Sequence, residues 1–271
     1  ALPHGLYEPW ISILKNGQME TWLKDTPNND CEIVHFHSTP VGKFGWYFDR
    51  IHEKLRWMNR YTSLALRFFD RISTLLLLLY IPKFSESNLL HTNGTSIHIK
   101  FPDTYQLMRW KDLAILKYFV EHTNYDFIFM STTSSYILPG KLMNVLQTLP
   151  REKVYGGVKP YDGASFAAGN NRLLSRDVAK RILEYQLIFD SGYIEDVAMG
   201  KLVKKLGFDF IELPSLHIRS EFELSTIEDR EIKKHFHIRV KSGDFNSRND
   251  VTIMKIVHKR LNNLKNQGEV H

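Results

Sequence analysis

The stretch Tyr125–Tyr136, with the sequence YDFIFMSTTSSY, decides the fold. Its first part, Phe127 to Met130, is a short apolar run, which is typical of a buried β-strand. The run passes into the hydroxyl side chains of Thr132, Thr133 and Ser134, with no carboxylate among them. Because the carboxyl ends of strands face the ligand crevice in α/β proteins, we expect these hydroxyl groups to border a binding site.

Short apolar runs alternate with segments of helical period along the chain, which predicts an α/β fold with a central sheet flanked by helices. The predicted strands are Glu32 to Phe36, Leu75 to Ile81, Ser96 to Lys100, Phe127 to Met130, Val154 to Val158 and Phe208 to Leu213. The predicted helices are Arg109 to Thr123, Ser175 to Phe189, and Ile194 to Leu206 with Gly207 closing it. No linker rich in Pro, Gly or Ser divides the chain. We therefore expect residues 1–271 to form a single domain on one continuous sheet, with functional halves 1–137 and 138–271.

The composition is that of an ordinary globular protein, with 24% charged and 43% hydrophobic residues, which excludes intrinsic disorder, collagen and coiled coil. The single cysteine, Cys31, rules out an internal disulfide bond and a multi-cysteine metal site, and it favours a cytoplasmic location. The most apolar run, Leu75 to Ile81, is far shorter than the roughly 20 residues that span a bilayer. The net charge of +6 suits an anionic partner, but it does not choose between a nucleotide diphosphate, a nucleic acid and a membrane surface.

Aromatic and basic residues are interleaved in the segment 42–71, for example Trp46 with Arg50 and Trp57 with Arg60. This pattern fits an amphipathic helical insertion whose aromatic side chains pack on the core. It also fits a peripheral contact with a membrane or a lipid acceptor, and a nucleic-acid platform.

Glu195 and Asp196 open a predicted helix, where the backbone dipole favours negative charge, so a structural role explains them. Ile194, Val197 and Met199 surround the pair with apolar side chains. A carboxylate at the mouth of an apolar pocket suits a general base that acts on a sugar hydroxyl. Both interpretations stay open at this point.

Small and amide side chains precede the predicted helix at Ser175. Gly169 allows a ligand or another backbone to come close, and Asn170 and Asn171 can donate hydrogen bonds to hydroxyl groups. A tight strand-to-helix turn explains the same residues without a ligand.

Basic residues recur in the C-terminal part of the chain. Alternation from His235 to Lys241 predicts an extended segment with its basic side chains on one face, a geometry that can clamp a diphosphate. A solvated basic edge explains the same pattern. The candidate residues are His217, Arg219, His237, Arg239, Lys241 and Arg248.

Four segments, taken in order, carry a resemblance to a known family. Residues 18–23 are similar to its N-terminal R-x-T-W segment, and residues 101–107 with Lys111 to its F-x-D-x-Y-x-N-L-x-x-K element. Residues 166–177 are similar to its G-G-x-x-L-S-R-D turn, and residues 195–207 to its E-D-V-x-x-G helix. The chain therefore resembles a GT-A glycosyltransferase of the β-1,3-galactosyl/N-acetylglucosaminyltransferase and fringe type.

This resemblance implies a Rossmann-like GT-A domain with a mixed, mostly parallel sheet. It implies an inverting glycosyltransferase that takes a nucleotide diphosphate sugar, such as a UDP-sugar, and a glycan or glycoconjugate acceptor, with Asp196 as the general base and Glu195 beside it. The acceptor-binding residues would be Gly169, Asn170 and Asn171. The donor-binding residues would be Thr132, Thr133, Ser134, Asp103, Lys111, His217, Arg219, His237, Arg239, Lys241 and Arg248.

The chain departs from the family at the acidic metal-binding triplet D-D-D, because Thr132, Thr133 and Ser134 stand in its place. Hydroxyl groups alone hold a divalent metal weakly. We therefore expect no manganese or other metal cofactor, and we expect basic residues to neutralise the leaving diphosphate. The same departure fits a catalytically inactive module that binds a nucleotide sugar or a glycan. The order of the motifs argues against a nucleic-acid partner.

Overall fold

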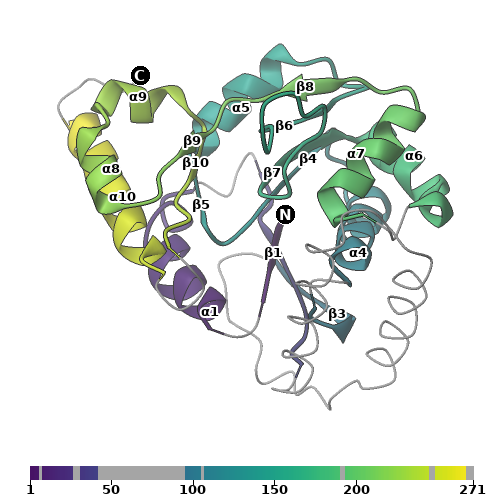
Figure 1. The fold of residues 1–271 in the computed structure, drawn as a ribbon, viewed down its shortest axis with the longest axis horizontal. Helices are drawn as coiled ribbons and strands as arrows, with labels where there is room; N and C mark the ends of the chain where they lie inside the picture. Colours follow the sequence, from purple (N-terminus) through teal and green to yellow (C-terminus); the bar gives the residue numbers. More distant parts are fainter. Residues whose placement is uncertain are drawn as a thin grey trace.

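A computed structural model describes residues 1–5, 8–26, 31–41, 95–104, 107–189, 193–243 and 248–266 (Figure 1). Within these ranges the chain is a mixed α/β protein, as the alternation of apolar runs predicts. The segment 42–71 and the predicted strand Leu75 to Ile81 lie outside the described residues. No helix in the described ranges is long and apolar enough to cross a membrane.

In the described residues, two groups of strands form the central layer. Three parallel strands lie in the order β1 (Leu2–His4), β2 (Val34–Thr39) and β3 (Thr95–Pro102). The other group has the order β4 (Phe127–Ser131), β7 (Asn171–Ser175), β6 (Tyr155–Gly157) and β8 (Phe210–Glu212), with β7 antiparallel to both neighbours.

Ala1 joins the two groups of strands. Its amino group donates to the Phe129 carbonyl at 2.7 Å, and its carbonyl accepts from the Ser131 N–H at 3.0 Å. In a parallel ladder, a residue forms hydrogen bonds with the two residues that flank its partner on the next strand, as Ala1 does with Phe129 and Ser131. The central layer is thus mixed and mostly parallel.

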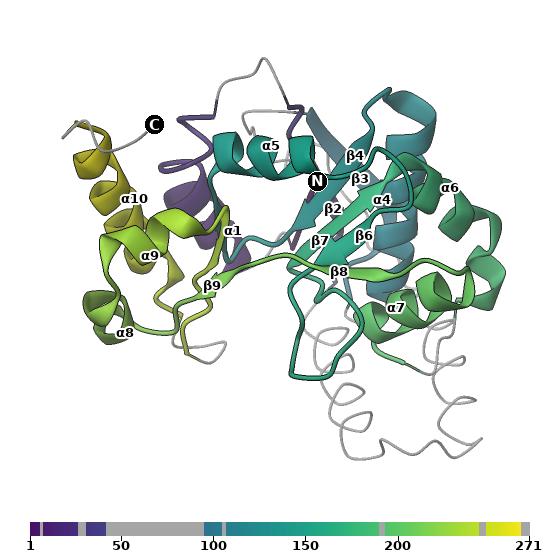
Figure 2. The same cartoon turned by 90° about the horizontal axis from the view of Figure 1, so that it is seen from above.

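Strand β4 is apolar along most of its length because helices cover both faces of the sheet. Ile128 and Met130 pack into one hydrophobic cluster with residues of three helices on one face. Phe127 and Phe129 contact a separate cluster on the other face. The helices are α4 (Met108–His122), α6 (Arg176–Glu184) and α7 (Glu195–Lys205) on one side, and α5 (Pro139–Thr148) on the other (Figure 2).

A second, smaller sheet holds the basic segment, so the expectation of one continuous sheet is wrong. Its strands are β5 (Ser135–Ile137), β10 (His237–Arg239) and β9 (Leu216–His217), in that order. The chain passes from the central layer into this sheet through residues 132–134. The alternation that predicted an extended basic segment is therefore confirmed as β10.

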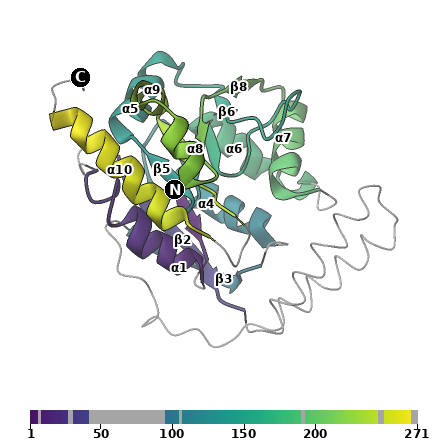
Figure 3. The ribbon, with the colours of Figure 1, turned by 60° about the vertical axis from the view of Figure 1, so that its left-hand side comes forward.

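Helices from both ends of the chain pack against the second sheet. Its hydrophobic cluster includes Leu14, Ile238 and Met254, and Figure 3 shows α10 running beside the α1 and η1 segment. These helices are α1 (Trp10–Ser12), the π-helix η1 (Ile13–Gln18), α8 (Glu221–Thr226), α9 (Asp229–Lys234) and α10 (Asp250–Asn266).

Two of the predicted helices are confirmed closely and one is shorter than expected. Helices α4 and α7 match the prediction within one residue at each end. Gly207, with φ +83°, follows the end of α7 as predicted. The helix that follows Ser175 ends at Glu184, and a short 3₁₀ helix, η4 (Gln186–Ile188), continues it.

Candidate functional site

The candidate site lies at the carboxyl edge of the central sheet, where β1 and β4 are neighbours. Strands β2 and β3 lie on one side of β1, and β4, which comes later in the chain, lies on the other side of β1. The strand order therefore reverses between β1 and β4. Ligands bind outside the carboxyl ends of strands at such a switch point. Asp103 follows β3, and residues 132–134 follow β4, so both predicted groups stand at this edge.

A buried histidine ties the hydroxyl segment to the second sheet. The Nε2 atom of His237 lies 2.9 Å from Ser135 Oγ and 3.4 Å from Ser131 Oγ. Its Nδ1 atom lies 2.6 Å from Ser215 Oγ. Burial, helped by the charge of Arg239, lowers the pKa of His237 to about 3. His237 is therefore neutral at neutral pH, and it does not supply the positive charge that the basic pattern suggested.

Arg248 brings a cation to the hydroxyl segment. Its Nη2 atom donates to Ser134 Oγ at 2.5 Å, and its Nε atom donates to Asp250 Oδ1 at 2.9 Å. Its guanidinium also lies over the ring of Trp10, 5.0 Å from the ring centre. Because Asp250 compensates its charge, Arg248 mainly holds the hydroxyl segment in place.

Arg239 presents a second guanidinium to the same region. Burial, together with nearby Arg248, lowers the pKa of Arg239 to about 10, so the group stays charged at neutral pH. Its Nη1 atom is buried and has no hydrogen-bond partner among the described residues. His217 pairs with Arg239 across β9 and β10, and burial and this charge lower the pKa of the His217 ring. Arg219 and Lys241 are exposed.

Glu195, the first residue of the acidic pair, belongs to a buried cluster of ion pairs. The Nη1 atom of Arg172 lies 2.6 Å from Glu195 Oε1 and 2.6 Å from Asp112 Oδ2. Burial opposes the charge of Arg172, but the two carboxylates outweigh it and raise the pKa of Arg172. Burial and the neighbouring Asp112 raise the pKa of Glu195 well above its usual range. Glu195 therefore serves as a buried anchor for the start of α7.

Asp196 is more accessible than Glu195 and differs from it in its contacts. It is half-buried, and its Oδ1 atom accepts from the Val197 N–H at 2.8 Å. Burial and the charge of Glu195 raise the pKa of Asp196 above the ordinary value of 3.8. A Cβ atom at Gly169 would lie 3.4 Å from Glu195 Oε2, so Gly169 lies beside the acidic pair.

Asp103 and Lys111 form a second buried ion pair at the same edge. Lys111 Nζ lies 2.6 Å from Asp103 Oδ1, and both side chains are less than one-tenth exposed. Lys111 precedes Asp112 on α4, so the two ion-pair groups are neighbours along that helix. The sequence assigned both residues to the donor, whereas the structure pairs them with each other.

The residues at the hydroxyl segment do not fit a divalent metal ion. Its side chains are neutral hydroxyl groups, and the described part of the chain contains no group of three His, Cys, Asp or Glu residues that could hold a metal ion. Hard cations prefer carboxylate oxygens, and neutral hydroxyl groups alone hold them weakly.

Several buried polar atoms at this edge have no partner among the described residues. They are Thr132 Oγ1, Asn170 Nδ2 and both amide atoms of Asn171. Ser131 Oγ donates to the Asn170 carbonyl at 3.0 Å, and Asn171 pairs with Ser131 across β4 and β7, so these atoms lie beside the hydroxyl segment. Buried polar groups are normally hydrogen-bonded, so this cluster of unpaired groups beside the hydroxyl segment is unusual.

The structure thus brings most of the predicted residues to one edge of the sheet. Arg172, Asp112, Ser135 and Asp250 join them although the sequence did not single them out. The available signal was a charged residue within an apolar segment, such as Arg172 before Leu173 and Leu174. The chain matches no protein-family model and shows no significant match to a curated protein.

Proposed function

We propose that the chain is an inverting glycosyltransferase that moves a sugar from a nucleotide diphosphate donor, such as a UDP-sugar, to a hydroxyl group of a glycan. One observation supports this proposal above the others. The hydroxyl groups after β4, which Arg248 contacts, and the carboxylates at the start of α7 border the same sheet edge. The β4–β7 pairing connects them, because Met130 lies opposite Arg172 and Ser131 opposite Asn171.

Asp196 accepts the proton of the attacking hydroxyl group. The oxygen of the acceptor then forms a bond to the anomeric carbon as the bond from that carbon to the diphosphate oxygen breaks. The electron pair leaves with the nucleoside diphosphate, and the configuration at the anomeric carbon inverts in this single displacement. A raised pKa suits Asp196 to this role, because a general base works best when its pKa lies nearer the working pH.

The leaving diphosphate needs positive charge, which Arg239 supplies with help from Lys241 and Arg219. Preorganised donors aimed at developing negative charge lower the barrier of such a step. Arg248 orients Ser134, and Thr132 to Ser134 donate to the phosphate oxygens. No step in this scheme passes through a metal ion.

Gly169, Asn170 and Asn171 form the acceptor side of the site. Gly169 lies beside Glu195, and Asn170 and Asn171 follow it directly, so the three residues border the carboxylates. We assign the enzyme to the cytoplasm, with residues 42–71 as a peripheral contact to a membrane-bound acceptor.

The test replaces the base without changing its size. Asp196→Asn should abolish transfer from UDP-sugars to a panel of glycan acceptors while leaving the affinity for UDP, measured by calorimetry, unchanged. Asp209→Asn is the matched control, because Asp209 is exposed and lies behind the far end of α7. Full turnover by Asp196→Asn would contradict the assignment.

A binding module for nucleotide sugars or glycans is the second candidate function. Glu195 held in an ion-pair cluster and hydroxyl groups in place of acidic residues favour it. Heat of UDP-sugar binding in the unmodified protein, with neither transfer nor donor hydrolysis, would decide for this module.

A further inference from the structure

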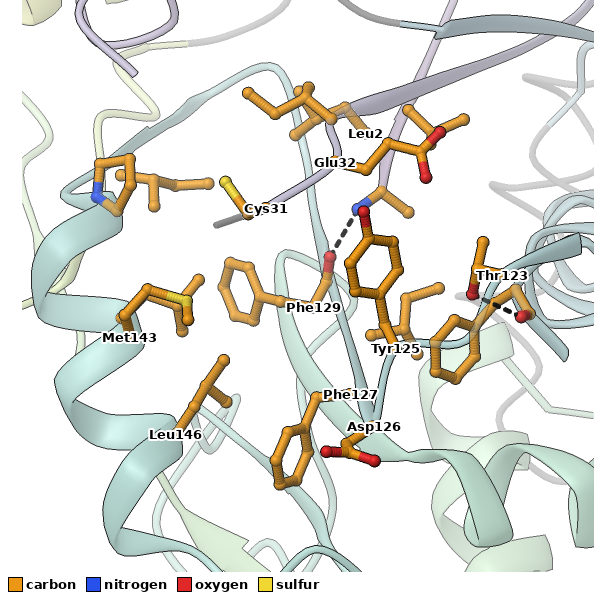
Figure 4. Close-up of a pocket in the computed structure, with 18 of the residues that line it drawn as sticks. Leu2, Cys31, Glu32, Thr123, Tyr125, Asp126, Phe127, Phe129, Met143 and Leu146 are labelled. Carbon is orange, nitrogen blue, oxygen red and sulfur yellow. Dashed lines mark hydrogen bonds between the residues drawn. The ribbon is translucent and has the colours of Figure 1, made fainter. Parts of the chain in front are cut away.

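Apolar side chains protrude where α6 ends and η4 follows it. Leu187 is 94% exposed, and Tyr185 and Ile188 are 40% and 45% exposed. Elsewhere apolar side chains line an interior space, as Phe129 and Leu146 do beside α5 (Figure 4). Leu187 instead projects into solvent, with Tyr185 and Ile188 close to it in the chain. We call these three side chains the apolar tip. Adjoining apolar groups that stay exposed commonly mark a contact surface.

Two aromatic rings at the apolar tip carry basic side chains. The guanidinium of Arg181 lies 4.8 Å from the ring centre of Tyr185, and Arg181 also pairs with Glu184 at 2.6 Å. Lys201 Nζ lies 3.3 Å from the ring centre of Tyr193, which is 36% exposed. Tyr193 follows the apolar tip by five residues, so it lies within about 17 Å of it. Exposed tyrosine rings beside basic side chains are typical of surfaces that meet a membrane interface.

The outer faces of α6 and α7 are basic. Both helices bury their inner faces in the same hydrophobic cluster on one side of the central sheet, so their outer faces lie on the same side of the molecule (Figure 2). Among the exposed residues that the structure describes in 176–189 and 193–205, Glu184 is the one acidic residue. The exposed basic residues there are Lys180, Arg181, Lys201, Lys204 and Lys205. Counting also Asp190, which lies outside the described residues, five basic side chains stand against two acidic ones.

We propose that the apolar tip and the basic outer faces of α6 and α7 dock on a bilayer that contains anionic phospholipids. Leu187 and Ile188 enter the boundary between the head groups and the acyl chains, and the tyrosine rings lie at the level of the head groups. The lysines face the lipid phosphates, which attract them. Charge selects this partner, because lysine is depleted in interfaces between proteins and enriched where a protein meets an anionic membrane. The surface is independent of the proposed glycosyl transfer.

Sedimentation with lipid vesicles tests the proposal without assuming any enzymatic activity. The full chain should bind vesicles of phosphatidylcholine mixed with phosphatidylserine about tenfold more tightly than vesicles of phosphatidylcholine alone. Added salt should weaken the binding to the mixed vesicles, because it screens the exposed lysines. Lys201→Gln should weaken binding to the mixed vesicles by about fivefold and change binding to phosphatidylcholine little.

A matched pair of variants separates the apolar tip from exposed apolar side chains in general. Leu187→Ser should weaken binding to the mixed vesicles by about tenfold or more, because it removes the side chain that enters the bilayer. Phe222→Ser is the control, since Phe222 is 79% exposed but lies on α8 between Glu221 and Glu223. It should bind as the unmodified protein does. Urea unfolding should show unchanged stability for both variants, because both side chains are exposed.

Three outcomes overturn the proposal. Absence of binding to the mixed vesicles by the unmodified protein removes the surface, and this result does not depend on any variant. Equal binding by Leu187→Ser and Phe222→Ser excludes the apolar tip and places the membrane contact elsewhere in the chain, for example in residues 42–71. Equal affinity of the unmodified protein for the two kinds of vesicle excludes the role of the basic faces.

Discussion

Arg172 Nη1 lies 2.6 Å from Glu195 Oε1, although Arg172 belongs to β7 and Glu195 opens α7. The same nitrogen lies 2.6 Å from Asp112 on α4. One buried guanidinium therefore fixes a strand and two helices at a single point, next to the proposed base Asp196.

Arg172→Met should destabilise the protein by about 3–5 kcal/mol, because it leaves two buried carboxyl groups without their cation. Arg172→Lys should cost less, since it keeps the positive charge and a single nitrogen of Arg172 makes both contacts to the carboxylates. Urea unfolding measures both values. Arg181→Met is the control and should change little, because the Arg181–Glu184 pair is exposed. An equal loss in Arg181→Met would contradict this account.

Two helical glycines should respond oppositely to alanine. A Cβ atom at Gly200 in α7 would lie 2.2 Å from Phe166 Cβ, so Gly200→Ala should destabilise the protein by about 1–3 kcal/mol. Gly140 in α5 has nothing within 4 Å of its added Cβ, so Gly140→Ala should stabilise by up to about 1 kcal/mol. Urea unfolding of the two variants tests the pair. An unchanged free energy of unfolding in Gly200→Ala would show that α7 does not pack closely against Phe166.

The buried His237 makes stability depend on pH. The unfolded chain takes up a proton near the ordinary pKa of 6.5, whereas folded His237 stays neutral down to about 3. The free energy of unfolding should therefore fall as the pH drops below 6.5, by about 1.4 kcal/mol per pH unit for this one residue. The test compares the unfolding of the unmodified protein and His237→Gln at several pH values between these limits. The variant should show a shallower slope, and an unchanged slope would contradict the prediction.

Arg239→Gln should weaken the affinity for UDP by about tenfold, because it removes a buried charge at the proposed diphosphate position. Calorimetry at constant salt measures the affinity. Arg230→Gln is the control, since Arg230 is 80% exposed and pairs with Glu228 on the surface. Unchanged UDP binding by Arg239→Gln would exclude Arg239 from the donor site.

Glycosyl transfer should persist in EDTA, because hydroxyl groups rather than carboxylates occupy the segment Thr132 to Ser134. The measurement is the initial rate of transfer with and without the chelator, and a manganese-dependent transferase assayed alongside should lose its activity. Strict dependence on added manganese would show that other residues hold a metal ion.

The sequence predicts the strands that carry their signal locally. Phe127 to Met130 reads as a strand because both faces of β4 are buried, which makes the run apolar throughout. The sequence does not predict β7 as a strand, because Asn171 and Arg172 are polar. The burial of Arg172 depends on Asp112 and Glu195, which are distant in the sequence, so no local pattern reveals it.

The candidate site shows the same division between local and tertiary information. The acidic pair and the hydroxyl segment could be located from their positions at element ends, and the structure brings them to one edge. The charge states could not be predicted, because they depend on burial. His237 belongs to a basic pattern in the sequence but is neutral in the fold.

The antiparallel direction of β7 brings a long loop to the edge of the sheet where the candidate site lies. Because β7 runs against its neighbours, the segment that leads into it, residues 158–170, arrives at the carboxyl edge where the other strands end. Insertions or exchanges there would reshape the proposed acceptor side without shifting Arg239, Arg248 or the hydroxyl segment after β4. Related chains could thus acquire new acceptors through this one loop while the groups proposed for the donor stay fixed.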